Sequence, residues 1–198
     1  MRRFAKQRIG DLKDSRDPQV VSGIISELRV INGTRGRVAI FKVDDKSDVI
    51  EAVANQDTLD ANKDLLKDDE LVIITGKVQT DRFSGGLRLN VQQVMSLPAA
   101  RCRYARFVRV QAKDQRLPVA EVLREFPARR IEAPQPDLPD TVQGLPIRVV
   151  VERRTPEVSA RAEVELGDKA KVFPSDQAMQ RFKELMPEAQ AVVVYGEG

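Results

Sequence analysis

Alternating apolar and polar positions predict β-strands in the first half of the chain. Residues 55–66 break this pattern, because their leucines recur at helical spacing with acidic residues between them. The strand-like runs are rich in β-branched residues, which suit a pleated, half-buried surface. They occupy residues 19–31, 35–43, 49–54 and 70–78, with a fifth in the second arm of a hairpin over 77–95. The predicted order is three strands, a helix and two strands.

Turn signals support this order. The Asn-Gly pair at 32–33 predicts a hairpin turn, and the Ser-Gly-Gly run at 84–86 predicts another, since glycine reaches positive φ without a Cβ clash. Gly23 and Gly76 lie inside predicted strands, where a strongly coiled barrel can bend. Five strands with one helix between the third and the fourth indicate a small OB-fold barrel.

The second half of the chain predicts a separate α+β domain after Pro98. Helices are expected at 99–106, 117–126 and 176–186, and strands at 107–111, 145–151, 159–166, 169–173 and 191–195. The proline-rich stretch 127–140 predicts a loop or tether.

We therefore expect a β barrel plus an α+β region, in three parts. Residues 1–18 form a basic lead-in with too few apolar residues to bury much surface. Residues 19–98 form the OB-fold domain, which binds single-stranded nucleic acid. Residues 99–198 form a C-terminal domain that binds a protein partner.

Composition removes several kinds of chemistry. The 198 residues include no histidine, which is the commonest general base and metal ligand. One cysteine, Cys102, permits neither an internal disulfide nor a cysteine-based zinc site. Neither a membrane-spanning apolar run nor a secretory signal is present, so a cytoplasmic location is the default.

Two acidic runs, 44–45 and 68–70, could hold a metal ion, but their places in turns favour capping of backbone N–H groups. Gly33, Gly36, Gly85 and Gly86 fall in predicted hairpins rather than before helices, which argues against a phosphate-binding loop. We expect no metal, no cofactor and no catalytic residues in these 198 residues, and therefore no enzyme activity.

Nucleic-acid binding is the better hypothesis. OB-folds bind single strands across strands 2 and 3, between the loops that join strands 1–2 and 4–5. Basic side chains there follow phosphates, and aromatic rings stack on bases. The candidates are Arg35, Arg37, Phe41, Lys42, Lys77, Arg82, Phe83 and Arg88. If Phe41 instead points into the barrel with Ala39 and Val43, Phe83 is the remaining stacking ring of this set.

The second domain offers apolar candidates for a protein partner in its last helix and terminal strand. These are Met179, Phe182, Val193 and Tyr195. Two alternatives to a two-domain module that binds nucleic acid and a protein partner stay open at this point. One is a free-standing OB-fold protein that binds single strands, and the other is an adaptor whose barrel binds protein.

Four motifs, taken in order, are more specific. They are the Val-Asp-Asp-Lys-Ser run at 43–47, the hairpin segment 76–88, the stretch 99–106 and the Pro-Ser-Asp run at 174–176. Over almost its whole length the chain resembles the C-terminal region of the alpha subunit of bacterial DNA polymerase III.

This resemblance implies an OB domain that contacts single-stranded template and a C-terminal domain that docks the tau subunit of the clamp loader. In this family the extreme C-terminus can also touch the sliding clamp. The polymerase's catalytic carboxylates lie far upstream, so we expect an expressed, non-catalytic fragment of a nucleotidyltransferase, with Met1 as a start residue.

Overall fold

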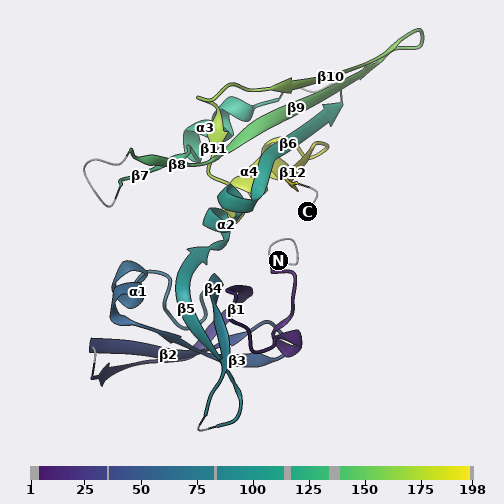
Figure 1. The fold of residues 1–198 in the computed structure, drawn as a ribbon. Coiled ribbons are helices and arrows are strands. Elements are labelled where there is room, and N and C mark those ends of the chain that lie inside the picture. Colours follow the sequence, from purple (N-terminus) through teal and green to yellow (C-terminus); the bar gives the residue numbers. More distant parts are fainter. Residues whose placement is uncertain (1–4, 35, 83, 114–116, 134–138, 197–198) are drawn as a thin grey trace. The chain divides into compact units, whose positions relative to one another are not determined.

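The computed structural model describes residues 5–34, 36–82, 84–113, 117–133 and 139–196. It divides into two compact units, Met1–Leu97 and Pro98–Gly198 (Figure 1). Within the described residues, no helix is long and apolar enough to cross a membrane.

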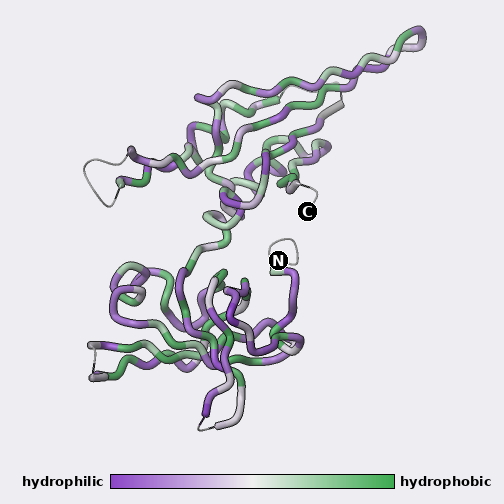
Figure 2. Tube along the Cα trace, viewed as in Figure 1, coloured by the Kyte–Doolittle hydropathy of each residue, from purple (hydrophilic) through white to green (hydrophobic). Residues whose placement is uncertain are grey.

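The first unit is a closed five-stranded barrel with the strand order β1-β2-β3-β5-β4. Its strands are β1 (Gln19–Gly33), β2 (Gly36–Asp44), β3 (Val49–Ala54), β4 (Leu71–Thr80) and β5 (Leu87–Ser96). Helix α1 (Gln56–Ala61) lies between β3 and β4 in the chain, in a mostly hydrophilic stretch (Figure 2). The parallel pairing of β3 with β5 closes the barrel. The predicted five-stranded OB-fold is confirmed.

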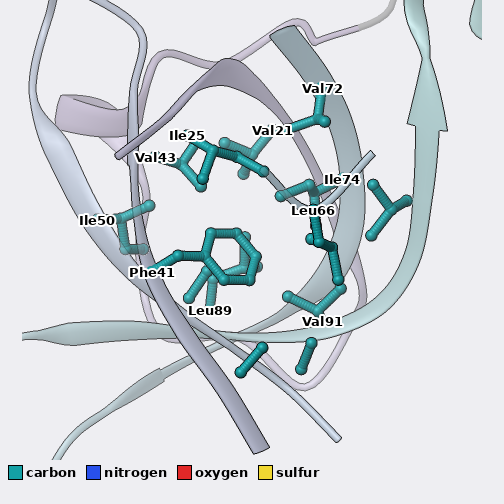
Figure 3. Close-up of a cluster of buried hydrophobic side chains, with 14 of the residues drawn as sticks. Val21, Ile25, Phe41, Val43, Ile50, Leu66, Val72, Ile74, Leu89 and Val91 are labelled. Carbon is teal, nitrogen blue, oxygen red and sulfur yellow. The ribbon is translucent and has the colours of Figure 1, made fainter. Parts of the chain in front are cut away.

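The side chains at alternate positions along the strands point inward and together fill the barrel. Ala39, Phe41 and Val43 are almost fully buried, while the residues between them on β2 are partly exposed. Phe41 retains 1% exposure and lies among aliphatic side chains from the other strands (Figure 3). Period-two alternation thus decides which residues form the core and which remain outside.

The two strand glycines permit close approach of backbones. A Cβ on Gly23 would lie 2.5 Å from the Asp44 carbonyl oxygen, and one on Gly76 would collide with the Asn90 carbonyl oxygen. The β4–β5 register also shifts between Thr75 and Gly76. The irregularity predicted at Gly76 is confirmed by this shift, the bend predicted at Gly23 stays a prediction, and neither position has room for a side chain.

The first hairpin turn lies later than predicted. Gly33 pairs with Gly36, so the predicted turn pair 32–33 still belongs to β1. Gly36 has φ +103°, a conformation that favours glycine. The positive φ is therefore found at Gly36 and not at Asn32.

The segment before β1 is part of the barrel, contrary to the expectation of a lead-in that buries little. A short 3-10 helix, η1 (Ile9–Asp11), places Ile9 in the barrel core together with Leu12. The Ser15 N–H donates to the Val78 carbonyl (3.0 Å), and Asp14 accepts from Thr80. Two apolar residues are enough to pack this segment on the barrel, because the side chains of the barrel surround them.

The second unit is built on a mixed sheet with the order β10-β9-β6-β12, and β11 also pairs with β9. Strands β6 and β9 are parallel, and the other pairs are antiparallel. The strands are β6 (Ala105–Lys113), β9 (Leu145–Arg154), β10 (Ser159–Glu165), β11 (Lys171–Val172) and β12 (Gln190–Tyr195). Its helices are α2 (Leu97–Tyr104), which leads into it, α3 (Val119–Glu125) and α4 (Asp176–Leu185).

The core of this unit lies between the sheet and two of its helices. Val108 and Ile147 from the sheet share one cluster with Val122 of α3 and Phe182 of α4. The Ala178 N–H donates to the Ser175 hydroxyl (3.1 Å), which caps the start of α4. The mixed α+β architecture is confirmed.

The proline-rich stretch differs from its prediction. Within it, β7 (Arg129–Ile131) is a strand, which forms a small hairpin with β8 (Thr141–Gln143) directly after the stretch. Prolines at 127 and 139 lie outside these two strands, where their missing N–H costs no ladder hydrogen bond. Prolines 134 and 136 lie outside the described residues.

Candidate nucleic-acid interface

The outer side of the barrel strands forms a continuous surface, here called the exterior face. Its residues alternate with the core positions and lie beside one another in the strand registers. The central members are Arg29 and Ile31 of β1, Ile40 and Lys42 of β2, Glu51 and Val53 of β3, and Arg88 and Asn90 of β5. The face combines basic side chains with exposed or half-exposed aliphatic ones.

Glu51 lies at the middle of the charged part of this face. It is directly opposite Lys42 on one neighbouring strand and Arg88 on the other. Nε and Nη2 of Arg88 donate to Glu51 Oε1 at 3.0 and 2.8 Å. Arg29 Nη2 lies 4.0 Å from Glu51 Oε2. Cations from two strands therefore approach one carboxylate, and Lys42 is its register neighbour on a third strand.

Two of the other predicted cations on the barrel, Lys42 and Arg37, are also paired with carboxylates. Lys42 Nζ donates to Glu27 Oε1 at 2.7 Å, and Arg37 Nη2 lies 2.8 Å from Asp60 Oδ1. The Lys63 ammonium lowers the pKa of Asp60, with a smaller contribution from Arg37, although burial opposes this shift. Since exposed ion pairs contribute little stability, these pairs can be exchanged for contacts with phosphates at low cost.

The β4–β5 loop is held by Asp81. Ser84 donates from its N–H (3.0 Å) and its hydroxyl (2.8 Å) to Asp81 Oδ2, while the Asp81 N–H donates to the Gly86 carbonyl (2.8 Å). Arg88 Nη1 also lies 3.2 Å from Asp81 Oδ1. The structure records no ion pair within its described residues for Arg82, which is exposed in this loop. The loop thus projects a cation beside the exterior face.

A surface hollow joins this loop to the exterior face. It is lined by Gln79, Thr80, Asp81, Arg82, Arg88 and Asn90. The Asn90 side-chain amide donates to Gln79 Oε1 at 2.9 Å, so hydrogen-bonding groups lie beside the two arginines. This arrangement can hold a polar, anionic group.

The structure brings four of the predicted interface residues onto or beside this surface: Lys42, Lys77, Arg82 and Arg88. Arg37 lies at the start of β2 with Asp60. Phe41 is wrong as a contact residue, because its ring fills the barrel and cannot reach a base. Arg35 and Phe83 lie outside the described residues.

Sequence reasoning missed Arg29, Glu51, Ile40 and Val53. Ile40 and Val53 follow from alternation once Phe41 is assigned to the core. Arg29 does not, because the β1 register shifts between Ser26 and Arg29 and Glu27 has φ +53°. The irregularity carries Arg29 to the outer surface, where simple alternation along β1 does not place it.

The acidic turn after β2 fits the capping hypothesis. Asp45 accepts from the Ser47 N–H (2.9 Å) and from the Ile9 N–H (2.9 Å) of the N-terminal segment. Burial raises the pKa of Asp45, but the hydrogen bonds from Ser47, Ile9 and Asp48 together hold it below its usual value. Within the described chain, no group of three or more potential ligand side chains could hold a metal ion.

The predicted partner-binding residues of the second unit are mostly turned inward. Phe182, with 1% exposure, is wrong as a docking residue because it is part of the core. Met179 and Val193 are half-buried and pack against the same cluster. Tyr195 is half-buried at the end of β12, and its role in docking stays a prediction.

Comparisons with known proteins agree with this architecture. Residues 19–97 match the family model for an OB-fold nucleic acid binding domain. The chain is 43% identical to DNA polymerase III subunit alpha of Pseudomonas fluorescens over 59% of its own length and 10% of that protein. It is 28% identical to the corresponding subunit of Vibrio cholerae over 93% of its length and 15% of that protein.

The chain is therefore homologous to a segment of DNA polymerase III alpha subunits, and it spans only 10–15% of these two relatives. Among solved structures, asparaginyl-tRNA synthetase from Pyrococcus horikoshii overlaps 48% of this chain and 23% of its own, at 17% identity and a TM-score of 0.38. That overlap is too slight to bear on function.

Proposed function

We propose that this homologue of a DNA polymerase III alpha segment is a non-catalytic replication module whose barrel holds single-stranded template. The observation that carries the proposal is the exterior face, where Arg29, Lys42 and Arg88 converge from three strands beside exposed aliphatic side chains. The match of residues 19–97 to a nucleic-acid-binding family model supports the same assignment.

In this proposal, nucleic-acid phosphates take the place of the carboxylates that now pair with the basic side chains. A phosphodiester replaces carboxylates at Arg29, Arg88 and Lys42, and released counterions drive the association. Ile31 is 46% exposed, and Ile40 and Val53 are half-buried, so sugars and base edges can pack on them. Because each cation already has a carboxylate nearby, we expect weak binding that falls steeply with salt.

An aromatic stacking platform would add to this surface. Among the described residues of the first unit, Phe41 is the one aromatic residue, and it is buried. Stacking on the β4–β5 loop would therefore depend on Phe83, as the sequence predicts.

We propose that the second unit carries the protein contact, with the clamp-loader tau subunit as the partner. The 187-residue match to the Vibrio cholerae protein covers 93% of this chain, so homology extends over most of both units. The contact would use exposed side chains, because the inward residues of α4 are committed to the core. Contact with a sliding clamp and a cytoplasmic location stay predictions of the sequence.

An adaptor whose barrel binds protein is the second candidate. Its support is the balance of charges on the exterior face, together with the aliphatic side chains of Ile31, Ile40 and Val53. A protein partner would bury these side chains without needing free cations. It would not show the salt dependence of a polyanion.

Fluorescence anisotropy of a labelled oligo-dT with the full chain tests the first candidate. We expect saturable binding that weakens between about 20 and about 200 mM salt, where phosphate contacts become screened. In Arg29→Ala/Arg88→Ala, the slope of log affinity against log salt should become shallower by about 1.4, at about 0.7 per phosphate contact.

The matched control is Arg153→Ala/Arg154→Ala, which removes the same charge from exposed positions on β9. Its binding should equal that of the unchanged chain. Absence of binding at about 20 mM salt, where screening is weak, would reject template binding and favour the adaptor. Equal losses in the two double variants would remove the exterior face from the site.

Direct binding of purified tau to the full chain, measured by surface plasmon resonance, tests the second unit. Gln180→Ala and Met179→Ser change neighbouring positions on α4, of which the first is exposed and the second packs on the core. Saturable tau binding would support the assignment, and a loss in Gln180→Ala would place the contact on the exposed side of α4. Absence of binding at micromolar concentrations would reject the assignment and leave the barrel proposal intact.

A further inference from the structure

We infer that Glu51 is a built-in competitor for nucleic-acid phosphate, and that its carboxylate sets the affinity of the exterior face. This inference rests on the proposed function and identifies the residue that regulates the same site. It assigns to an acidic residue the central position on a surface that is proposed to bind an anion.

The geometry around Glu51 resembles that of a bound oxyanion. Two N–H groups of Arg88 converge on Oε1 at 3.0 and 2.8 Å, and Arg29 approaches Oε2 at 4.0 Å. Lys42 is its direct cross-strand neighbour. Arginine recognises carboxylate and phosphate oxygens with the same planar fork of donors. A phosphodiester oxygen can therefore take the place of Oε1 without rearrangement of β3 or β5.

Glu51 is better suited to this role than the other carboxylates of the face. The Asp81 side chain is only 9% exposed and accepts two hydrogen bonds from Ser84, so its displacement would disturb the loop. Glu27 contacts Lys42, at the edge of the cluster. The Glu51 side chain is 34% exposed and contacts cations from two different strands, so its rotation toward solvent would free both.

Charge balance gives the expected direction. Arg29, Lys42 and Arg88 are matched by Glu27, Glu51 and Asp81, and the cluster is formally neutral. Every phosphate that enters must first displace Glu51 or bind beside its negative charge. Loss of that charge leaves a net cation at the centre of the face. A neutral residue in place of Glu51 should therefore tighten nucleic-acid binding. Removal of a charged residue from a binding surface usually has the opposite effect.

The test is anisotropy of labelled oligo-dT with the full chain and with Glu51→Gln. The amide keeps the size of the side chain and removes its charge. We expect roughly two- to fivefold tighter binding, the factor that corresponds to the loss of one exposed ion pair. The salt slope should steepen by about 0.7, equivalent to one additional phosphate contact on a single strand.

Asp64→Asn is the matched control, because it removes the same charge from an exposed residue whose recorded ion pair is with Lys67. It should leave affinity and slope unchanged. Glu51→Thr provides a second neutral variant whose β-branched side chain suits an outward strand position. Thermal unfolding checks that both variants are folded, and either one can decide the question.

A double-variant cycle identifies the cation involved. In an Arg88→Gln background, Glu51→Gln should give a smaller gain in affinity, because the freed Arg88 fork is missing and Arg29 alone is released. An equal gain with and without Arg88 would overturn the exchange mechanism.

Two further outcomes separate this inference from the proposed function. If the unchanged chain binds and Glu51→Gln matches Asp64→Asn, the role of Glu51 is overturned and template binding stands. If neither the unchanged chain nor either Glu51 variant binds at about 20 mM salt, where screening is weak, template binding itself is rejected, and the inference with it.

Discussion

The two units bury their apolar residues in different ways. In the barrel, inward side chains of β1–β5 meet one another, so the outer surface of the strands needs no covering layer. In the second unit, the core forms between an open sheet and its own helices α3 and α4. In the second unit, the apolar side of a helix is therefore used up in packing against the sheet. In the barrel, the outward residues of the strands remain available to a ligand.

This contrast changes where function should be sought. The stripe that includes Phe182 looks like a docking surface in the sequence, yet it is the inner face of α4. The residues around Glu51 give no such signal, yet they converge from three strands on the barrel surface. The best candidate surface in the described structure is thus made of residues that belong to no apolar stripe.

The largest expected effects come from the two buried rings. Phe41→Ala should lower the unfolding free energy of the barrel unit by about 3–5 kcal/mol, and Phe182→Ala should do so in the second unit, because each leaves a cavity in a packed core. Hydrogen exchange followed by mass spectrometry reports on each unit separately. Unchanged protection of β1–β5 in Phe41→Ala would contradict the assignment of this ring to the barrel interior.

A smaller effect is expected from a strand glycine. Gly23→Ala should destabilise the barrel by about 1–3 kcal/mol, because the new Cβ would lie 2.5 Å from the Asp44 carbonyl oxygen. Gly167→Ala in the second unit is the control, since no described residue beyond its two chain neighbours has an atom within 4 Å of the position that its new methyl group would take. Chemical denaturation should separate the two, and equal stability of both variants would argue against close packing of β1 on β2.

Acid should loosen the N-terminal segment from the barrel. The Thr80 N–H and hydroxyl hold the pKa of Asp14 below its usual value, and hydrogen bonds similarly lower that of Asp45 against the effect of burial. A lowered pKa in the folded state stabilises the fold above the unfolded value of about 4, and this stabilisation is lost as pH falls through the folded value.

The barrel's unfolding midpoint, measured from about pH 6 to about pH 2, should therefore fall at the acid end. In Asp14→Asn/Asp45→Asn this fall should be shallower. A variant with the same acid dependence as the unchanged chain would show that these two carboxylates do not tether the segment.

The smallest expected effect is that of Arg82→Ala. Its side chain is exposed in the β4–β5 loop, so stability should change by less than about 0.5 kcal/mol. The salt slope for oligo-dT binding should become shallower by about 0.7, the value for one phosphate contact. Lys183→Ala, an exposed cation on α4, is the control and should leave the slope unchanged.

The fold was largely predictable because it follows from local patterns. Period-two alternation identifies β2 and puts Phe41 on the same side as Ala39 and Val43, and the structure shows that this side is the buried one. The interior glycines mark the places where backbones approach. The short hairpin of β7 and β8 was missed because it lies among prolines and buries little.

The candidate site was less predictable because it depends on contacts between distant residues. Glu51 and Arg88 are 37 positions apart, and their pairing follows from the parallel register of β3 and β5. The irregular register of β1 decides that Arg29 joins them. The hydrogen bond from Thr80 to Asp14 spans 66 positions and brings the N-terminal segment onto the barrel. No local pattern encodes these pairings.

Titration of the ¹⁵N-labelled full chain with oligo-dT, followed by amide and arginine Nε resonances, tests the central claim most directly. The account predicts that perturbations concentrate on β1, β2, β3 and β5 around Glu51, with the Arg88 Nε resonance among the largest. Saturation with the shifts confined to the second unit, or no shift at low salt, would contradict the assignment of the exterior face as the nucleic-acid site.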